Sequence, residues 1–422
     1  MRPELATSAA QIAAAVAGRL ADPQQVLLRT HPVPAHIALP GCALLAARYT
    51  QSDPHAAGSV AALMRTVLGE LPAGPNNVFQ GSIGALTTAL ILGKTSDVQL
   101  QSFADSGSGW LSRYVIELSD QARKRTVDDA SAGMLIEEYD AVSGLAGLGR
   151  TLLRAWAAGH TGAEPGIAAA LQSVTWLLSP PVRQMPHWWL PHGVRSHFAP
   201  QAPSGGASTG MAHGVAGPLA FLCIALDSGF EAVGTRESVN YAAYWLLEHR
   251  VPGTWQWPRE VSGDRLRTGV EDSTPSVAND RWCNGSSGIA SALYMAGRAL
   301  GDPVLVESGV SALSALADKP VSDWGAYGPH VCCGYAGILR CAVSMMRSTS
   351  DPRLHAVTEQ AAECLVRLWD PDTPFGFRHL ATSGTEIQGM SDLLYGASGI
   401  ALALHDFATE EDSLWPSLLL LS

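Results

Sequence analysis

The sequence has little charge. Of its 422 residues only 15% are charged, against 47% that are hydrophobic, and the formal net charge is -11. An acidic chain of this kind lacks the broad positive footprint that binds nucleic acids or anionic membranes. Both are therefore excluded as main partners. The hydrophobic fraction is instead large enough for an extensive core.

Targeting and membrane signals are also missing. The first residues, Met1-Arg2-Pro3-Glu4-Leu5, lack the basic segment and the continuous apolar core of a secretory signal. No uninterrupted apolar run reaches the length needed to cross a bilayer. We therefore expect a cytoplasmic protein without a transmembrane segment.

The cysteines do not have the pattern of a disulfide framework. Their number is odd, and most lie in apolar runs with helical spacing, which fits reduced thiols. The C-x-x-C pairs of many metal sites are lacking as well. The seven cysteines are at positions 42, 223, 283, 332, 333, 341 and 364.

What the chain does have is a recurring Gly-x-x-G step, each time followed by an Ala/Leu/Ile-rich run. The first glycines of the six steps are residues 81, 144, 214, 285, 334 and 396, so successive steps are 63, 70, 71, 49 and 62 residues apart. This spacing fits one helical hairpin plus a loop per repeat. Glycine lets the backbone turn and approach closely at a helix start, and the apolar runs are typical of inner helices covered by outer ones. The repeat predicts an all-α protein, a closed double ring of six helical hairpins forming a single domain over residues 1–422.

The segments between the steps complete this ring. Residues 8–21 and 40–71 have helical apolar spacing and are expected to form the first outer helices. Two stretches, near residues 177–210 and 251–280, are irregular and rich in aromatic residues or Pro and Gly. Long segments of this kind are usually functional or disordered. We expect them to lie as insertions over the active-site end of the ring.

The residues just before the steps carry the chemistry. In a closed ring all inner helices begin at one end, so these residues should meet at one rim. Cys283, Cys332 and Cys333 lie there at helix starts, where the helix dipole favours thiolates. His213 stands one residue before its own step. Three soft ligands with an open fourth position are typical of a catalytic zinc site, and a substrate thiol that filled this position would be deprotonated.

Each of these residues also has a plainer interpretation. The adjacent cysteines could be small buried packing residues. His213 could be a structural histidine, and Asp140, close to its helix start, a capping carboxylate. His330 could replace one thiol as a ligand, although it stands four residues before Gly334 and so out of register with His213.

Taken together, these residues resemble the lanthionine cyclases, also called lanthipeptide synthetase component C-like proteins, over nearly the whole chain. The matching motifs are Trp282-Cys283-Asn284-Gly285, Cys332-Cys333-Gly334, Ala212-His213-Gly214, Tyr139-Asp140 and the repeated Gly-x-x-G step. The resemblance implies an α/α toroid of six hairpins with Zn2+ at one mouth. It also implies that cysteine thiols of a precursor peptide are added to dehydroalanine or dehydrobutyrine, which closes thioether rings.

The resemblance assigns a role to five residues. Cys283 and Cys332 match the two cysteine ligands of the zinc ion, and Cys333 falls where most members have a histidine ligand. His213 and Asp140 match the histidine and the aspartate implicated in proton transfer. All five positions hold a residue that suits its role.

The chain departs from the family pattern at two positions. Cys333 replaces the histidine of the usual Cys-His-Gly, as in a branch of the family with three cysteine ligands. The additional thiolate charge should leave a substrate sulfur more electron-rich and its bond to zinc weaker. Asn284 stands where tyrosine or histidine is more familiar, so no role is assigned to it.

We therefore expect a zinc-dependent lanthipeptide cyclase that acts on a dehydrated precursor peptide. The chain has no room for a dehydratase domain beside the ring, so a separate dehydratase is expected as a partner. One alternative is a non-catalytic protein that captures thiols such as glutathione on zinc, or that scaffolds a peptide-modification complex. Another is a different toroid enzyme, such as a prenyltransferase or a glycoside hydrolase. The hydrolase needs paired carboxylates, and apart from Asp140 the steps offer none.

Overall fold

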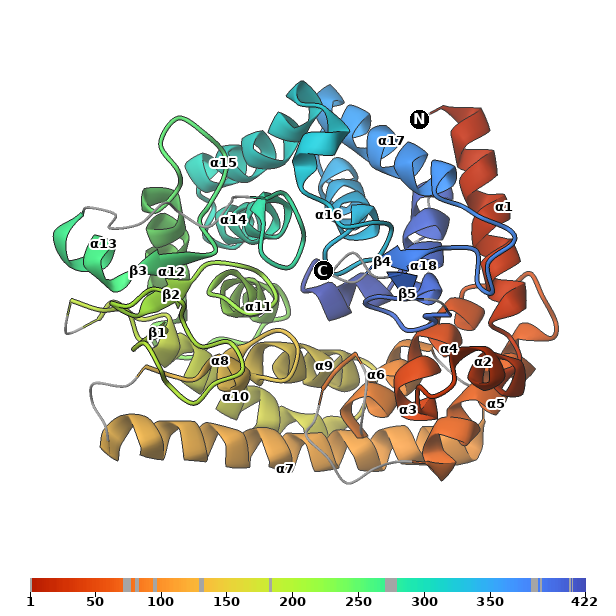
Figure 1. Ribbon diagram of the computed structural model, residues 1–422. Helices are drawn as coiled ribbons and strands as arrows, with labels where there is room; N and C mark the ends of the chain where they lie inside the picture. The colour runs from red at the N-terminus through yellow and green to blue at the C-terminus, as the bar shows by residue number, and fades with distance from the viewer. Residues whose placement is uncertain are drawn as a thin grey trace. The chain divides into compact units, whose positions relative to one another are not determined.

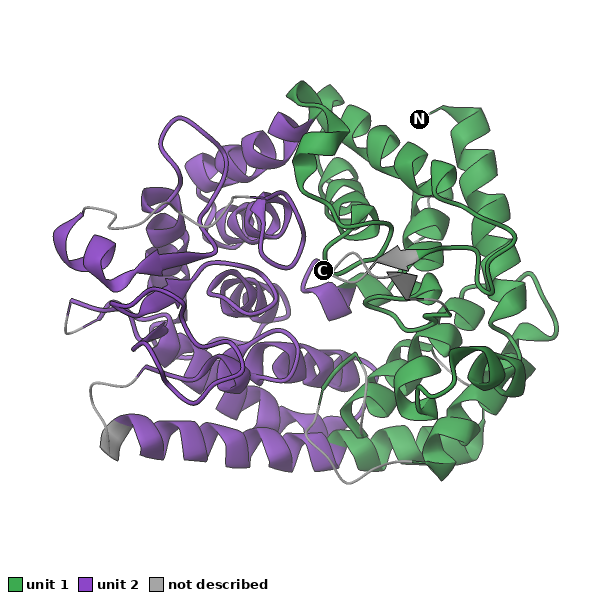
Figure 2. Cartoon of the chain, in the orientation of Figure 1, with its two compact units in different colours: residues 1–108, 317–416 green, residues 109–316, 417–422 purple. Residues whose placement is uncertain are grey.

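The computed structural model describes residues 2–70, 77–79, 83–93, 97–128, 133–181, 184–269, 279–380, 386–387, 389–409, 411 and 413–422. The chain divides into two compact units, coloured separately in Figure 2. Unit 1 consists of Met1–Ser108 and Ala317–Pro416, and unit 2 of Gly109–Leu316 and Ser417–Ser422. Both units are mainly helical, as the sequence predicts.

Unit 2 contains a series of helical pairs. The pairs are α9 (Leu145–Ala157) with α10 (Glu164–Leu177), α11 (Ala216–Asp227) with α12 (Thr235–Glu248), and α14 (Ser286–Leu300) with α15 (Pro303–Ser314). The first helix of each pair follows a Gly-x-x-G step, and these helices also pack in order, α9 on α11 and α11 on α14. Figure 1 shows α11 and α14 side by side, nearly along their axes. The step helices thus form an inner layer of unit 2.

Unit 1 has the same kind of packing. Here α16 (Tyr335–Met346) packs on α17 (Pro352–Arg367), and α18 (Ala397–Ala408) packs on α16 and on α1 (Pro3–Arg19). The helix after the first step, α6 (Ile83–Gly93), is buried along most of its length. The first glycine of that step, Gly81, lies outside the described residues.

The expectation of one outer helix over residues 40–71 is wrong. The segment forms two helices, α4 (Pro40–Ala47) and α5 (Ala56–Gly69), and α4 is buried on nearly every side between α5, α6 and α18. The reason is visible in its sequence, since Pro40-Gly41-Cys42-Ala43-Leu44-Leu45-Ala46 has no polar face. A helix that is apolar all round is an inner helix even without a Gly-x-x-G step.

The remaining elements connect these layers. The helices are α2 (Pro23–Thr30), α3 (Ala35–Ala38), α7 (Val98–Asp128), α8 (Ile136–Tyr139) and α13 (Gly263–Thr268). Short 3-10 segments occur at Thr161–Ala163, Ala315–Asp318, Val321–Trp324 and Trp415–Leu419, and β4 (His379–Leu380) pairs with β5 (Glu386–Ile387).

The two irregular stretches of unit 2 fold together. The first supplies β1 (Trp189–Leu190) and β2 (Gly206–Ser208), the second supplies β3 (Glu260–Ser262), and they form an antiparallel sheet in the order β1-β2-β3. Trp188 and Trp257 in these stretches are fully buried, and the Trp257 indole donates to the Leu246 carbonyl at 2.6 Å. Residues 182–183 and 270–278 of the two stretches lie outside the described residues. The described parts of both stretches pack on α12, since the Trp188 ring also lies edge-on against Trp245 of that helix, with centroids 5.1 Å apart.

Candidate functional site

Five step helices are preceded by what we term an approach loop, the five residues that end at the first glycine: 140–144, 210–214, 281–285, 330–334 and 392–396. Each loop turns so tightly that its last residue meets its first. A Cβ on Gly144 would lie 2.2 Å from the Asp140 nitrogen, and one on Gly285 would lie 2.4 Å from the Arg281 nitrogen. The φ angles of these glycines are -94° and -130°, which any residue adopts. Space is therefore the reason for glycine here.

Successive approach loops are hydrogen-bonded to one another within each unit. In unit 2 the Ala141 N–H donates to the Ala212 carbonyl at 3.0 Å, and the Ala212 N–H donates to the Cys283 carbonyl at 2.9 Å. In unit 1 the Cys332 N–H donates to the Leu394 carbonyl at 3.0 Å. These bonds hold the side chains that precede successive steps close together, as the repeat predicts.

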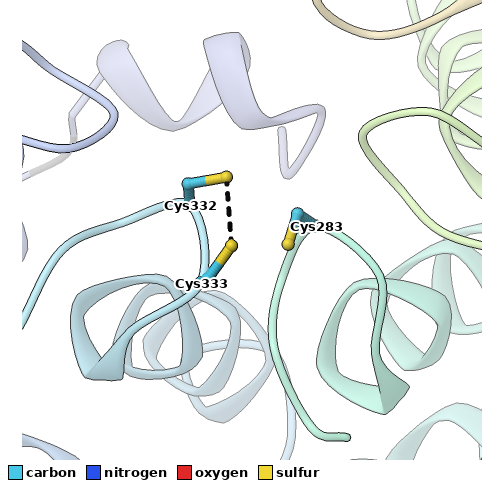
Figure 3. A group of neighbouring side chains, drawn as sticks. All are labelled: Cys283, Cys332 and Cys333. Carbon is cyan, nitrogen blue, oxygen red and sulfur yellow. Dashed lines mark hydrogen bonds between the residues drawn. The ribbon is translucent and has the colours of Figure 1, made fainter. Parts of the chain in front are cut away.

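Three cysteine thiols form a cluster, drawn in Figure 3. The Sγ atoms of Cys283, Cys332 and Cys333 all lie within 4.8 Å of one another, and those of Cys332 and Cys333 are 3.5 Å apart. Three sulfurs bound to one zinc ion at about 2.3 Å would stand about 3.8 Å apart at tetrahedral angles. The cluster could therefore bind a metal ion. Cys283 and Cys332 are buried and Cys333 is half-buried, so Cys333 is the most accessible of the three.

The loop that carries Cys283 is fixed on both sides. The hydroxyl of Ser286, the first residue of α14, donates to the buried Asp280 carboxylate at 2.5 Å. The indole of Trp282 donates to the Leu419 carbonyl at 3.0 Å, also inside unit 2. Because the neighbours of the thiol are held by buried hydrogen bonds, its backbone has little freedom to move.

His330 supports the loop that carries the other two thiols. The Cys333 N–H donates to the His330 Nδ1 at 3.2 Å, and the imidazole lies beside Tyr395 with ring centroids 5.4 Å apart. His330 stands four residues before its glycine, as Asp140 does in its own loop. In both loops the side chain at this position accepts a backbone N–H. The Nδ1 of His330 thus serves the backbone next to the cluster.

Asp140 and His213 form a pair in unit 2. The Asp140 Oδ1 accepts the N–H groups of Val142, Ser143 and Gly144 at 2.9, 2.7 and 2.8 Å, while its Oδ2 lies 2.7 Å from the His213 Nδ1. Asp140 is 1% exposed and the His213 side chain 25%. An ionised carboxylate can only accept, so Nδ1 donates and Nε2 is the basic nitrogen of the neutral ring. Asp140 is therefore both a cap for its loop and a partner that orients His213.

Two further residues at this pair are not apparent from the sequence. The Phe198 ring stacks on His213 with centroids 3.8 Å apart, and Glu137 binds the chain just before Phe198. The one signal for Phe198 is its position in the first irregular stretch. No spacing rule connects it with a histidine in an approach loop, because the contact depends on the path of that stretch.

Burial marks two of the other cysteines as packing residues. It raises the pKa of the Cys42 thiol to about 12 and raises that of Cys223 as well, so both stay protonated at neutral pH. All seven cysteines are free thiols.

A comparison with solved structures defines the class of fold. Nisin cyclase matches with a TM-score of 0.75 and 17% identity, over 93% of this chain and 94% of that chain. The protein therefore has the all-α, α/α toroid fold that the sequence predicts. An unsaturated glucuronyl hydrolase from Bacillus sp. GL1 also matches, with a TM-score of 0.47 and 13% identity over 79% of this chain and 89% of that one, which is too distant to support an argument.

The family follows from the sequence profile. The profile described as lanthionine synthetase C-like protein matches residues 78–420, and the chain belongs to this family, as its motifs indicate. No curated protein sequence matches the chain. Within the described part of the chain, no helix combines the length and the hydrophobicity that crossing a membrane requires.

Proposed function

We propose that this protein is a zinc-dependent lanthionine cyclase. Its family and its fold support the cyclase class. The observation that carries the proposal is the hydrogen bond from the Ala212 N–H to the Cys283 carbonyl, which joins the loop of an Asp140-bound histidine to the loop of a clustered thiol. A proton carrier beside a candidate metal centre is what addition of a thiol to a double bond needs.

The thiols of Cys283, Cys332 and Cys333 would hold the zinc ion. When bound, zinc would lower the pKa of a coordinated substrate thiol and so supply a thiolate at neutral pH. The donor set suits this role, because three protein sulfurs leave the fourth position of a tetrahedral ion for a substrate. Soft thiol donors also suit zinc better than magnesium or calcium.

His213 is the proposed proton carrier. A sulfur–carbon bond forms at the β-carbon of the dehydro residue while the carbon–carbon π bond breaks, and its electrons move to the α-carbon. The Nε2 of His213 takes the proton from the substrate thiol and delivers one to the α-carbon, so the reaction is neutral in mass and charge. Asp140 keeps the other ring nitrogen as the donor throughout.

The substrate is a precursor peptide whose serines and threonines have been dehydrated by a separate dehydratase. We place both proteins in the cytoplasm, where the seven free cysteines stay reduced. We further propose that residues 1–422 act as one domain, with the two irregular stretches on the active-site side. The contact of Phe198 with His213 supports this position for the first stretch.

The test is incubation of the purified protein with a dehydrated peptide that contains cysteine. Because ring closure does not change the mass, alkylation of free thiols before mass spectrometry scores the product. We expect thiol loss with the unmodified protein and none with Cys333→Ala, which should also lose most of its zinc. Peptide binding without thiol loss would instead identify a thiol-binding or scaffold protein. Full zinc retention in Cys333→Ala, with His330 on the metal, would show that the third ligand is wrong.

A further inference from the structure

The imidazole of His213 is held at two places. The Asp140 Oδ2 lies 2.7 Å from its Nδ1 and so fixes one edge of the ring. Apart from this hydrogen bond the ring is held only by its covalent bond to Cβ, so its plane can still tilt about the Cβ–Cγ bond. The Phe198 ring removes this freedom, because it lies against the imidazole face with centroids 3.8 Å apart and planes at 23°.

The Glu137 carboxylate holds the chain segment that carries Phe198 through hydrogen bonds. It accepts the Ser196 hydroxyl at 2.9 Å and the His197 N–H at 2.7 Å. The same Ser196 oxygen accepts the Phe198 N–H at 3.1 Å. A charged acceptor makes stronger hydrogen bonds than a neutral one. The backbone on the N-terminal side of Phe198 is thus fixed by one carboxylate.

The carboxylate that holds the Phe198 segment and the carboxylate that orients His213 both belong to α8 and its cap. Glu137 lies in α8, and Asp140 is the residue that caps the C-terminal end of that helix. The helix itself is anchored, since the Glu138 carboxylate accepts the Leu135 N–H at 2.8 Å and the Arg125 side chain of α7 at 3.2 Å. The carboxylate that binds His213 and the carboxylate that holds the Phe198 segment therefore come from α8 and its C-terminal cap residue.

We propose that Phe198 and Glu137 are positioning residues for the His213 proton carrier. Phe198 sets the plane of the imidazole and covers one of its faces, and Glu137 holds Phe198 in place. The inference rests on the proposed function of His213. It requires that loss of the stack impairs proton transfer while peptide binding stays the same, because neither residue needs to touch the substrate for this effect.

The first experiment separates kcat from KM. In Phe198→Leu, kcat for cyclisation should fall roughly 10-fold through misorientation of the imidazole, with KM for the peptide and the zinc content unchanged. Phe198→Tyr keeps the ring and should restore kcat. The matched control is Phe230→Leu, since Phe230 is also half-buried in unit 2 but packs edge-on against Trp156. A rise in KM at constant kcat would make Phe198 a substrate contact and overturn the proposal.

The second experiment tests whether Glu137 acts by holding Phe198 in place. Glu137→Ala should lower kcat by about the same factor as Phe198→Leu, and the double variant should lose no more than either single one, because the two residues act through one contact. Glu137→Gln keeps an oxygen acceptor for the His197 N–H and should be less impaired. If the decreases in kcat were additive in the double variant, Glu137 would not act through Phe198.

A third measurement does not depend on cyclisation. Diethyl pyrocarbonate modifies exposed neutral imidazoles, and peptide mapping by mass spectrometry gives the rate at His213. This rate should rise several-fold in Phe198→Leu and Glu137→Ala and stay unchanged in Phe230→Leu. Unchanged rates in all variants would overturn the positioning role. An unmodified protein that retains zinc but cyclises no peptide would instead refute the proposed function.

Discussion

The approach loops of α9 and α18 have an aspartate at the same position and use it differently. The Oδ1 of Asp140 accepts three backbone N–H groups, and the Oδ1 of Asp392 accepts those of Leu394 and Tyr395 at 3.0 and 2.9 Å. The second oxygen of Asp140 binds His213. Among the described residues no basic side chain forms an ion pair with Asp392, and burial raises the pKa of its carboxyl group. The cap is common to both loops, whereas the imidazole partner is specific to one.

The thiols extend the comparison. In the approach loop of α16, the two residues before the glycine are Cys332 and Cys333, and in that of α18 they are Leu394 and Tyr395. A backbone hydrogen bond joins Cys332 to Leu394 directly. The backbone arrangement of the approach loops is therefore a structural feature that both loops share. The side chains at a few positions decide which loops contribute to the candidate site. Equivalent positions in other loops then serve as matched controls.

The largest effect is expected from loss of a clustered thiol. Cys283→Ala should strip most of the zinc and lower the cyclisation rate roughly 10³-fold or more, since the substrate thiol would have to ionise and find its position unaided. Cys223→Ala removes a buried thiol of α11 instead and should keep both zinc and rate. Zinc content by elemental analysis and thiol loss by alkylation are measured on the same preparations. Retention of zinc in Cys283→Ala would contradict its role as a ligand.

The next largest effect is expected at the Asp140–His213 pair, with Asp392 as the comparison. His213→Ala should keep zinc and peptide binding but cyclise roughly 10²-fold more slowly, the usual contribution of a positioned acid or base. Asp140→Asn keeps the cap but presents an NH2 group to Nδ1, which favours the wrong tautomer and should slow cyclisation by a smaller factor. Asp392→Asn should cyclise at the unmodified rate. Loss of zinc in His213→Ala would show that the histidine is a ligand or a structural support.

The approach loops were predictable because their signals are local. A glycine pair before an apolar run predicts each helix start, and register alone groups Cys283 with Cys332 and Cys333. The resemblance adds the pairing of Asp140 with His213, which are 73 residues apart and which no local pattern connects. These features repeat or match a motif, so they can be recognised without knowing the path of the chain.

The supports of the site were not predictable in this way. Phe198 and Glu137 meet through a loop whose course depends on the β1-β2-β3 sheet, and that sheet joins strands more than 50 residues apart. The two-residue strand β1 is too short to leave an alternating pattern in the sequence. Helix α4 shows a different limit. Its apolar residues predict a helix, but the step motif that marks the other inner helices is absent.

A stability measurement tests the close backbone packing at the Gly-x-x-G steps. A Cβ on Gly147, the second glycine of its step, would lie 2.2 Å from the Ala141 carbonyl oxygen inside the fold. Because backbone atoms cannot give way as a side chain does, Gly147→Ala should lower the free energy of unfolding by about 3 kcal/mol. Gly18→Ala, at an exposed position of α1 with no atom near the added methyl group, should be neutral or stabilising by up to about 1 kcal/mol. Denaturant titration measures both, and equal effects would remove the steric explanation.

The smallest effect concerns the stability cost of Asp392. Burial raises the pKa of its carboxyl group in the folded protein above the ordinary value, although backbone hydrogen bonds, those of Leu394 and Tyr395 among them, partly oppose the shift. The folded state therefore holds this proton to higher pH than the unfolded state, and its contribution to stability is lost as the pH rises through the raised pKa. At neutral pH Asp392→Asn removes the buried charge and keeps the acceptor for Leu394 and Tyr395. We expect its Tm at pH 7 to rise by roughly 1–3 °C, with the gain disappearing in acid, where the carboxyl group is protonated in both states.

Asp140→Asn should instead lower the Tm at pH 7, because it replaces a carboxylate that binds three N–H groups and an imidazole. Thermal scans at several pH values on the two variants measure this difference in sign, and a lower Tm for Asp392→Asn at pH 7 would mean that this carboxylate, too, is stabilised as a charge.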